Sequence, residues 1–342
     1  MKDCNEQVRG YHQAEVKMND YGRNDIFNKA KANRKRLREG LIRDNRPAPL
    51  GSRTQGSYAM RTLIHDPKGD YDIDDGVYFK KEDLIGERGA ELSALAVRQM
   101  VCAALQDERF AEQPEVLKNC VRIYYQEGYH VDVPAYRRVT TADLFNGVTS
   151  YNYELASADW KASDALSVTK WFRDQNKALC GDATGNGNNG QFVRVVRLVK
   201  AFARSRPHWN GKMASGFALT KLVADHFVEV LDRDDRALRD VLRAIRDRLA
   251  YDDGVQHPTL NECIAAPGSA RTAFLRRKLV DKLPGLDVLD EADCTHDQAM
   301  RAWDKFFKSD WFRNQPDPAD EEDLEEKTKA PAVIKSGGQG YA

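Results

Sequence analysis

Residues 69–79 read GDYDIDDGVYF. Apolar and acidic residues alternate in it, which predicts a strand over residues 71–79. Side chains alternate across a strand, so Asp72 and Asp74 project from one face and Ile73 from the other. Two carboxylates on one small patch repel each other, and a divalent cation between them relieves that repulsion. For this triplet alone, an exposed strand without a metal is the alternative interpretation.

A Gly-Ser turn upstream strengthens the metal interpretation. Residues 54–57 read TQGS and end fifteen residues before Asp72. A Gly-Ser turn lets backbone N–H groups and a hydroxyl approach phosphate oxygens closely, although Gly-Ser is also common in ordinary turns. The combination of this turn with a strand bearing two alternate acids is far more restrictive than either feature alone.

A third acid lies in a second predicted strand. Residues 129–136 read YHVDVPAY, and Asp132 stands in the middle of this apolar run. Aspartate is disfavoured in such a strand unless it has a partner. One interpretation is a salt bridge from Asp132 to Arg122 or Arg137. The other is that Asp132 joins the two upstream acids to hold two Mg²⁺ ions for an in-line phosphoryl displacement.

The remaining pattern predicts an α+β protein with two lobes and a tail. A short connection containing glycine at 126–128 predicts an antiparallel hairpin between strands at 121–125 and 129–133. Composition predicts helices over 1–45 and 90–105, and apolar spacing of three and four predicts helices over 168–179, 192–204, 216–230 and 235–249. The predicted domains are a mixed lobe at 1–155, a helical lobe at 156–314 and an acidic, flexible tail at 315–342. The glycine-rich segment 181–190 is predicted to be a loop.

The helix predicted over 192–204 carries both an apolar stripe and a row of cations. Its basic residues fall opposite the stripe, which is typical of a solvated basic face; they are Arg194, Arg197, Lys200 and Arg204. Lys200 differs because it lies at the margin of the stripe. There a lysine can be half-buried and directed into a cleft, as a triphosphate clamp requires.

Charge and composition exclude several classes of protein. The 342 residues contain 53 Lys+Arg and 53 Asp+Glu, so the formal net charge is +0. A protein that coats duplex nucleic acid needs an excess of positive charge, and no long nucleic acid is expected as a partner. No stretch approaches about 18 consecutive apolar residues, so we expect a cytoplasmic protein without a membrane partner.

Four segments together resemble the cGAS/DncV-like nucleotidyltransferases of the polymerase β-like superfamily. They read TQGSYAMRT, GDYDIDDGVYF, YHVDVPAY and LVKAFARSRPHW. The DIDDG and HxDVP strings are very similar to those of the DncV type of cyclic dinucleotide synthase, and the likeness runs from about residue 50 to about residue 265. It implies a two-lobed, polymerase β-like fold, with a mixed or antiparallel sheet in one lobe and a long spine helix joining it to a helical lobe.

The resemblance also implies roles for individual residues. The three acids would bind two Mg²⁺ ions, or Mn²⁺ in their place: Asp72, Asp74 and Asp132. The nucleotide would be contacted by Gln55, Gly56 and Ser57 at the donor phosphates, by Lys200 at the triphosphate, by Ser163 and Ser215, and by Glu262 at a purine edge. Capping of the following helix is the alternative for both serines. At Met60 the sequence departs from the family pattern, which has an aromatic residue there, so base choice does not transfer.

By this resemblance the protein would be a bacterial enzyme that joins ATP and GTP into a cyclic dinucleotide such as cGAMP. The product would act as a second messenger in antiphage (CBASS) defence and activate a downstream effector. The C-terminal IKSGGQGYA, ending at Ala342, is compatible with conjugation by partners similar to ubiquitin-activating and conjugating (E1/E2-like) enzymes. Two alternatives remain: a linear oligoadenylate or RNA-tailing transferase, and a catalytically silent nucleotide-binding scaffold.

Overall fold

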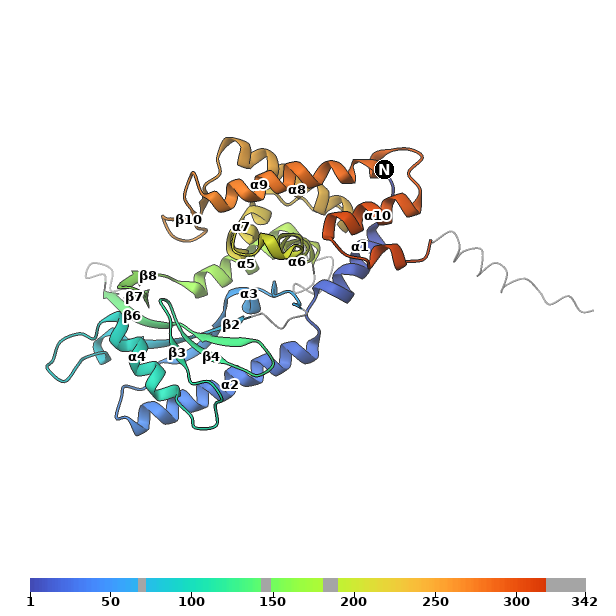
Figure 1. Cartoon of the computed structure of the whole chain (residues 1–342). Helices are drawn as coiled ribbons and strands as arrows, with labels where there is room; N and C mark the ends of the chain where they lie inside the picture. Colours follow the sequence, from blue (N-terminus) through green and yellow to red (C-terminus); the bar gives the residue numbers. More distant parts are fainter. Residues whose placement is uncertain (67–71, 143–148, 181–189, 318–342) are drawn as a thin grey trace, which may run out of the picture. The chain divides into compact units, whose positions relative to one another are not determined.

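The computed structural model describes residues 1–66, 72–142, 149–180 and 190–317 (Figure 1). The chain divides into two compact units, one formed by Asp3–Leu283 and the other by Met1–Lys2 with Pro284–Ala342. Nearly all of the predicted loop at 181–190, the tail beyond residue 317 and the terminal Ala342 lie outside the described residues. The lobe boundary expected near residue 155 stays a prediction.

The described elements confirm an α+β fold. The α-helices are α1 (Asn5–Tyr11), α2 (Asp20–Arg43), α3 (Gly56–Ala59), α4 (Ala94–Leu105), α5 (Ala165–Leu179), α6 (Gln191–Arg204), α7 (Gly216–His226), α8 (Asp234–Tyr251), α9 (Ala270–Lys282) and α10 (His296–Phe307). A π-helical turn, η1 (His12–Val16), follows α1, and the 3-10 turns are η2 (Lys81–Asp83), η4 (Pro207–Trp209), η5 (Leu283–Asp290) and η6 (Phe312–Asn314).

The strands are β1 (Gly51–Gln55), β2 (Asp72–Lys80), β3 (Glu115–Val116), β4 (Val121–Tyr124), β5 (His130–Val133), β6 (Ala135–Ala142), β7 (Thr149–Ala156), β8 (Trp160–Ala162), β9 (Val255–Gln256) and β10 (Cys263–Ala265). The first eight form one mixed sheet, and β9 pairs with β10. The predicted hairpin is confirmed, because β4 and β5 are antiparallel neighbours.

Strand β2 is the centre of the sheet. It pairs antiparallel with β1 and parallel with both β5 and β6. The register is the same on both sides of Pro134, since Asp74 lies opposite Asp132 and Val77 opposite Ala135. Strands β5 and β6 therefore line one edge of β2 as a single strand interrupted at Pro134, and β1 lines the other edge.

The two faces of β2 have opposite character. Ile73, Val77 and Phe79 are fully buried and belong to a core that includes the apolar residues of α2 and α4. Figure 1 shows these two helices along one side of the sheet. Asp75 points to the same side, where Arg34 of α2 forms a bidentate pair with it. The alternate residues, Asp72 and Asp74, therefore face away from the core.

The basic face predicted for α6 is wrong for two of its cations. Arg197 is buried, with its Nε donating to the Arg61 carbonyl at 2.8 Å. Arg194 pairs with the buried carboxylate of Asp234. Helix α6 contacts η1 as well as α7 and α8, so protein covers the side on which a solvated face was expected. Only Arg204 among the arginines of this helix is exposed.

Some boundaries differ from the sequence prediction. Helix α4 begins at Ala94 rather than at residue 90, because the Ser93 hydroxyl accepts a hydrogen bond from Ala96 N–H and caps the helix. Helix α7 ends at His226, short of the predicted residue 230. None of the described helices combines the length and apolar character needed to cross a membrane.

The second unit contains an aromatic cluster. Helix α10 starts with a capping box between Thr295 and Gln298. The rings of Trp303, Phe307 and Phe312 stack on one another, with centroids 5.9 to 6.1 Å apart. The Asp304 carboxylate accepts hydrogen bonds from the N–H groups that follow, at Phe312 and Arg313. These contacts fasten η6 to α10.

Helices α2 and α4 approach each other at Gly40, which yields a prediction about stability. A Cβ at Gly40 would lie 2.7 Å from the Ala104 Cα and closer still to the Ala104 carbonyl oxygen. We expect Gly40→Ala to lower the free energy of unfolding by about 2 kcal/mol through overpacking, despite the better helix propensity of alanine. Urea denaturation followed by circular dichroism measures this change.

The matched control is Gly285→Ala, because an added Cβ there meets no atom within 4 Å. This variant is expected to unfold at the same urea concentration as the parent protein. Equal stability of the two variants would contradict the close packing of α2 against α4.

Candidate metal and nucleotide site

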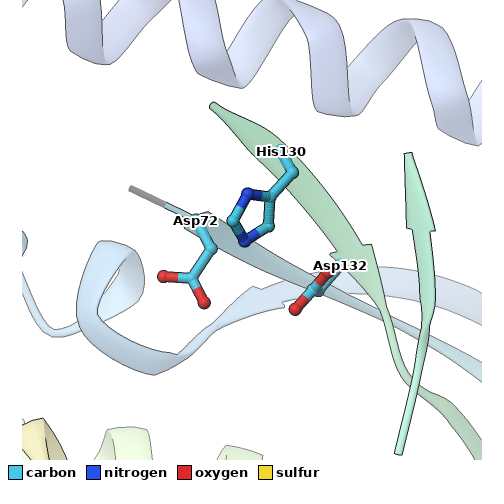
Figure 2. Close-up of side chains that lie close together, drawn as sticks. All are labelled: Asp72, His130 and Asp132. Carbon is cyan, nitrogen blue, oxygen red and sulfur yellow. The ribbon is translucent and has the colours of Figure 1, made fainter. Parts of the chain in front are cut away.

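Parallel pairing of β2 and β5 gathers ionisable side chains on one face of the sheet. Asp72 lies opposite His130, and Asp74 lies opposite Asp132. Figure 2 shows Asp72, His130 and Asp132 directed toward one another, with the imidazole beside both carboxylates. One ligand atom from each of these three residues lies within 4.8 Å of the others. The compact group therefore consists of two of the predicted acids and a histidine.

The third predicted acid, Asp74, lies beside this group and against the Gly-Ser turn. Gly56 has a φ of +62°, and a Cβ there would lie 3.2 Å from the Asp74 Cγ and nearer still to Oδ2. Only glycine leaves room for the carboxylate in this conformation. Burial, together with the negative charges of Asp72 and Asp132, raises the pKa of Asp74 to about 7. The site thus resists full ionisation unless a cation is added.

Asp132 forms a salt bridge with Arg122, which was one of the two interpretations of this residue. Arg122 Nε and Nη2 each donate to one Asp132 oxygen at 2.8 Å, and this bond raises the pKa of Arg122. The pairing does not exclude metal binding, because an ionised carboxylate offers about four lone pairs. Arg137, the other partner considered, pairs with Glu154 and Glu91 instead.

The charges on this face do not balance. The carboxylates of Asp72 and Asp74 form no ion pair or hydrogen bond within the described residues, and Arg122 is the one cation that contacts any of the three acids there. Oxygen ligands at such spacing suit Mg²⁺ or Mn²⁺. The donor set therefore fits a divalent cation at Asp72, Asp132 and the adjacent Asp74.

The three turn residues predicted to contact phosphates differ in which of their groups are free to bind a ligand. The Gln55 side chain is 5% exposed, and its amide donates to the Tyr136 hydroxyl at 2.8 Å and accepts from the Tyr78 hydroxyl at 3.1 Å. Both ends of this amide are therefore hydrogen-bonded to tyrosines of the sheet. Ser57 is half-buried, and its carbonyl accepts the N–H of Thr62. Gly56, Ser57 and their backbone remain the candidates for a phosphate contact at this turn.

Lys200 is more deeply buried than the predicted half-burial, with an exposed fraction of 8%. Its Nζ donates to the Thr62 hydroxyl at 2.8 Å and to the Thr62 carbonyl at 3.3 Å. Burial, with Arg204 and Arg197 adding repulsion, lowers the pKa of Lys200 to about 7. An anion placed beside this amine would restore its charge.

The two candidate serines occupy different positions. The Ser215 hydroxyl accepts the Ala218 N–H at 3.1 Å and caps α7, as its alternative interpretation states. Gly216, the next residue, lies beside the Lys200 side chain. Ser163 does not cap α5, because Asp164 does so. The Ser163 side chain instead reaches the Tyr136 hydroxyl.

Glu262 and Met60 are not members of the group formed by Asp72, His130 and Asp132. Glu262 forms an exposed ion pair with Lys161 at 2.9 Å. Met60 is buried and lines a cavity of about 290 Å³ together with Ala59, Arg61, Phe172, Arg173, Asn176 and Val193. A role for Glu262 at a purine edge stays a prediction.

His130 is the site residue that sequence reasoning missed. The signal was present, because His130 and Asp132 are separated by one residue, as Asp72 and Asp74 are. The alternation that places two acids on one face places the imidazole there as well. The histidines of the sequence lack HxxxH and HExxH spacing, which argues against a histidine-ligated metal, but those motifs do not cover a histidine paired with an aspartate on a strand.

Comparisons with known proteins agree with this geometry. Residues 52–136, which hold the turn, β2 and β5, match the family model "Cyclic GMP-AMP synthase DncV-like, nucleotidyltransferase domain". The crystal structure of Escherichia coli DncV in its 3′-deoxy GTP bound form is similar, with a TM-score of 0.65 and 18% identity, covering 92% of this chain and 98% of that one.

Two Vibrio cholerae structures are similar to the same extent. DncV cyclic AMP-GMP synthase with nonhydrolyzable GTP gives a TM-score of 0.67 at 17% identity and covers 90% of this chain and 96% of that one. The same synthase with the linear intermediate 5′ pppA(3′,5′)pG gives 0.62 at 17% identity, covering 86% and 92%. Residues 52–136 therefore match the nucleotidyltransferase domain model of the DncV-like family, and the chain has the fold of the DncV structures.

Proposed function

We propose that this protein joins two nucleoside triphosphates, ATP and GTP, into a cyclic dinucleotide such as cGAMP and releases pyrophosphate. The observation that carries the proposal is the parallel register of β2 and β5, which places Asp72, Asp74 and Asp132 on one face beside the Gly56 turn. Nucleotidyl transfer needs such a set of carboxylates next to a phosphate-binding turn. The similarity to synthases whose structures hold GTP and a linear intermediate supports it.

Each residue of the site has a role in this proposal. Two bound Mg²⁺ ions would lower the pKa of the attacking ribose hydroxyl and neutralise the pyrophosphate leaving group. Asp72, Asp74 and Asp132 hold the cations, and Arg122 fixes the orientation of Asp132 through its two hydrogen bonds. Asp132 accepts the proton of the attacking hydroxyl, which makes it the base of the transfer.

The phosphates would lie between the turn and the spine helix. Backbone N–H groups at Gly56 and Ser57 contact the donor phosphates, and Lys200 of α6 contacts the triphosphate. After the first transfer the linear intermediate turns over so that the second hydroxyl attacks. The product would serve as a second messenger in antiphage defence, acting on an effector that binds cyclic nucleotides.

The product distinguishes this function from its alternatives. Protein incubated with Mg²⁺ and the four NTPs is expected to release pyrophosphate and a product without a 5′-triphosphate, because ring closure consumes it. Mass spectrometry measures this, and a nuclease specific for 3′–5′ bonds reports the linkage. A product that keeps its triphosphate would point to a linear transferase, and binding of NTP without pyrophosphate release would point to a silent scaffold.

The acids give a second prediction. We expect Asp72→Asn and Asp74→Asn each to reduce pyrophosphate release by about 1,000-fold or more, because loss of a cation ligand removes several kcal/mol of charge stabilisation. The rate of pyrophosphate release in a coupled assay measures the effect. Asp83→Asn is the matched control, since Asp83 is exposed in η2 beyond the far end of β2. Full activity in both site variants would refute the metal assignment.

Lys200 gives a prediction about proton uptake. Its pKa of about 7 in the free protein leaves the amine mostly neutral at pH 8, and a bound triphosphate raises the pKa back toward the ordinary value. Binding of a non-hydrolysable NTP at pH 8 should therefore take up close to one proton, whereas binding at pH 6 should take up none at this residue. Calorimetry in buffers of different ionisation enthalpy measures the uptake.

Two variants test the assignment of that proton. Lys200→Met should bind the nucleotide more weakly and without the uptake at pH 8. Lys212→Met, which changes an exposed lysine, should retain it. Uptake of the same size in both variants would place the proton on another group.

A further inference from the structure

His130 lies beside the carboxylates of Asp72 and Asp132, and in the part of the chain that the structure describes its nitrogens have no hydrogen-bonding partner. Within the described residues the imidazole makes no hydrogen bond, and its nearest aromatic neighbour is the Tyr124 ring, with centroids 6.4 Å apart. One of its nitrogens lies within 4.8 Å of a carboxylate oxygen of Asp72 and of Asp132. In Figure 2 the ring stands beside both carboxylates on the same face of the sheet.

The spacing of these atoms fits one shared ion. Ligands on opposite sides of an ion at about 2.1 Å lie about 4 Å apart, and adjacent ligands lie about 3 Å apart. Small rotations of the three side chains therefore bring all of them within bonding distance of one centre. The backbone supports this arrangement, because β2 and β5 hold Asp72 and His130 directly opposite each other.

We propose that His130 is a direct ligand of the metal ion bound by Asp72 and Asp132, and that this nitrogen raises the affinity of the site for a first-row transition ion such as Mn²⁺ without excluding the Mg²⁺ of the proposed transfer. Mg²⁺ demands oxygen ligands and keeps several waters, whereas imidazole binds transition ions well. Arg122 adds to this preference. It donates hydrogen bonds to both Asp132 oxygens, so these oxygens bind a cation less strongly and the imidazole nitrogen matters more. This inference rests on the proposed function only where the bound metal is given a role in nucleotidyl transfer. Metal binding itself can be measured without nucleotides.

Mn²⁺ itself is the probe for the test. In the full-length protein with one equivalent of Mn²⁺, electron spin echo envelope modulation is expected to show coupling to a directly bonded ¹⁴N nucleus. His130→Gln should abolish this coupling, because the glutamine amide can offer an oxygen but no imidazole nitrogen. His208→Gln is the matched control, since His208 is exposed in η4 and outside the acid group.

The affinities separate a ligand from a residue with a structural role. Removal of a ligand should weaken Mn²⁺ binding about 10-fold or more, since loss of even an outer-sphere partner costs that much. Mg²⁺ binding, measured by competition against the Mn²⁺ signal, should change by less than about threefold, because Mg²⁺ does not depend on the nitrogen. Equal losses for both ions would show that His130 only shapes the site and would overturn the proposal.

The outcomes also separate this proposal from the proposed function. Nitrogen coupling that disappears in His130→Gln would establish the ligand even if no nucleotidyl transfer is found. Transfer activity without nitrogen coupling in the parent protein would retain the function and refute the ligand. Coupling that persists in His130→Gln would assign the nitrogen to another residue.

Discussion

The parallel register of β2 against β5 is the constraint on which the rest of the site depends. Each strand carries two polar residues separated by one apolar residue, and the register places Asp72 opposite His130 and Asp74 opposite Asp132. Three carboxylates then share one face with Arg122 as their one contacting cation among the described residues. Burial, with the neighbouring charges of Asp72 and Asp132 added to it, raises the pKa of Asp74. A divalent ion relieves this repulsion, so metal binding and the stability of this face are linked.

The other residues of β2 are engaged in packing or in an ion pair, apart from the metal-site acids. Ile73 anchors the apolar core, and Asp75, which adds a further negative charge, is neutralised on that side by Arg34. Gly76 is required by packing, because a Cβ there would lie 2.7 Å from the Gln55 amide oxygen and 3.0 Å from the Tyr136 ring. The acids therefore remain the groups of this strand that are available to a ligand.

The sequence predicted the parts of the molecule that follow from local periodicity. The alternation of Asp72 and Asp74, the hairpin and the helix that carries Lys200 could be read from spacing alone. Strands β6 to β8 could not, because polar and aromatic residues are mixed over residues 135–162 without a clean alternation. The burial of Arg197 was also hidden, since the period of a helix shows an apolar stripe but not the elements that cover its other sides. Which acid contacts which cation depends on strand register, and no local pattern specifies register between distant strands.

Hydrogen bonds connect helix α6 to the segment after the Gly56 turn. Two cations of α6 make these bonds, and in the described part of the chain neither of them contacts a carboxylate. Arg197 donates to the Arg61 carbonyl and Lys200 donates to the Thr62 carbonyl and hydroxyl. The Thr62 N–H in turn donates to the Ser57 carbonyl. Helix α6 therefore holds the segment that begins at Gly56 by its backbone. Burial of a cation is costly unless an anion compensates it, and in the proposed function the phosphates between Ser57 and Lys200 would supply that compensation.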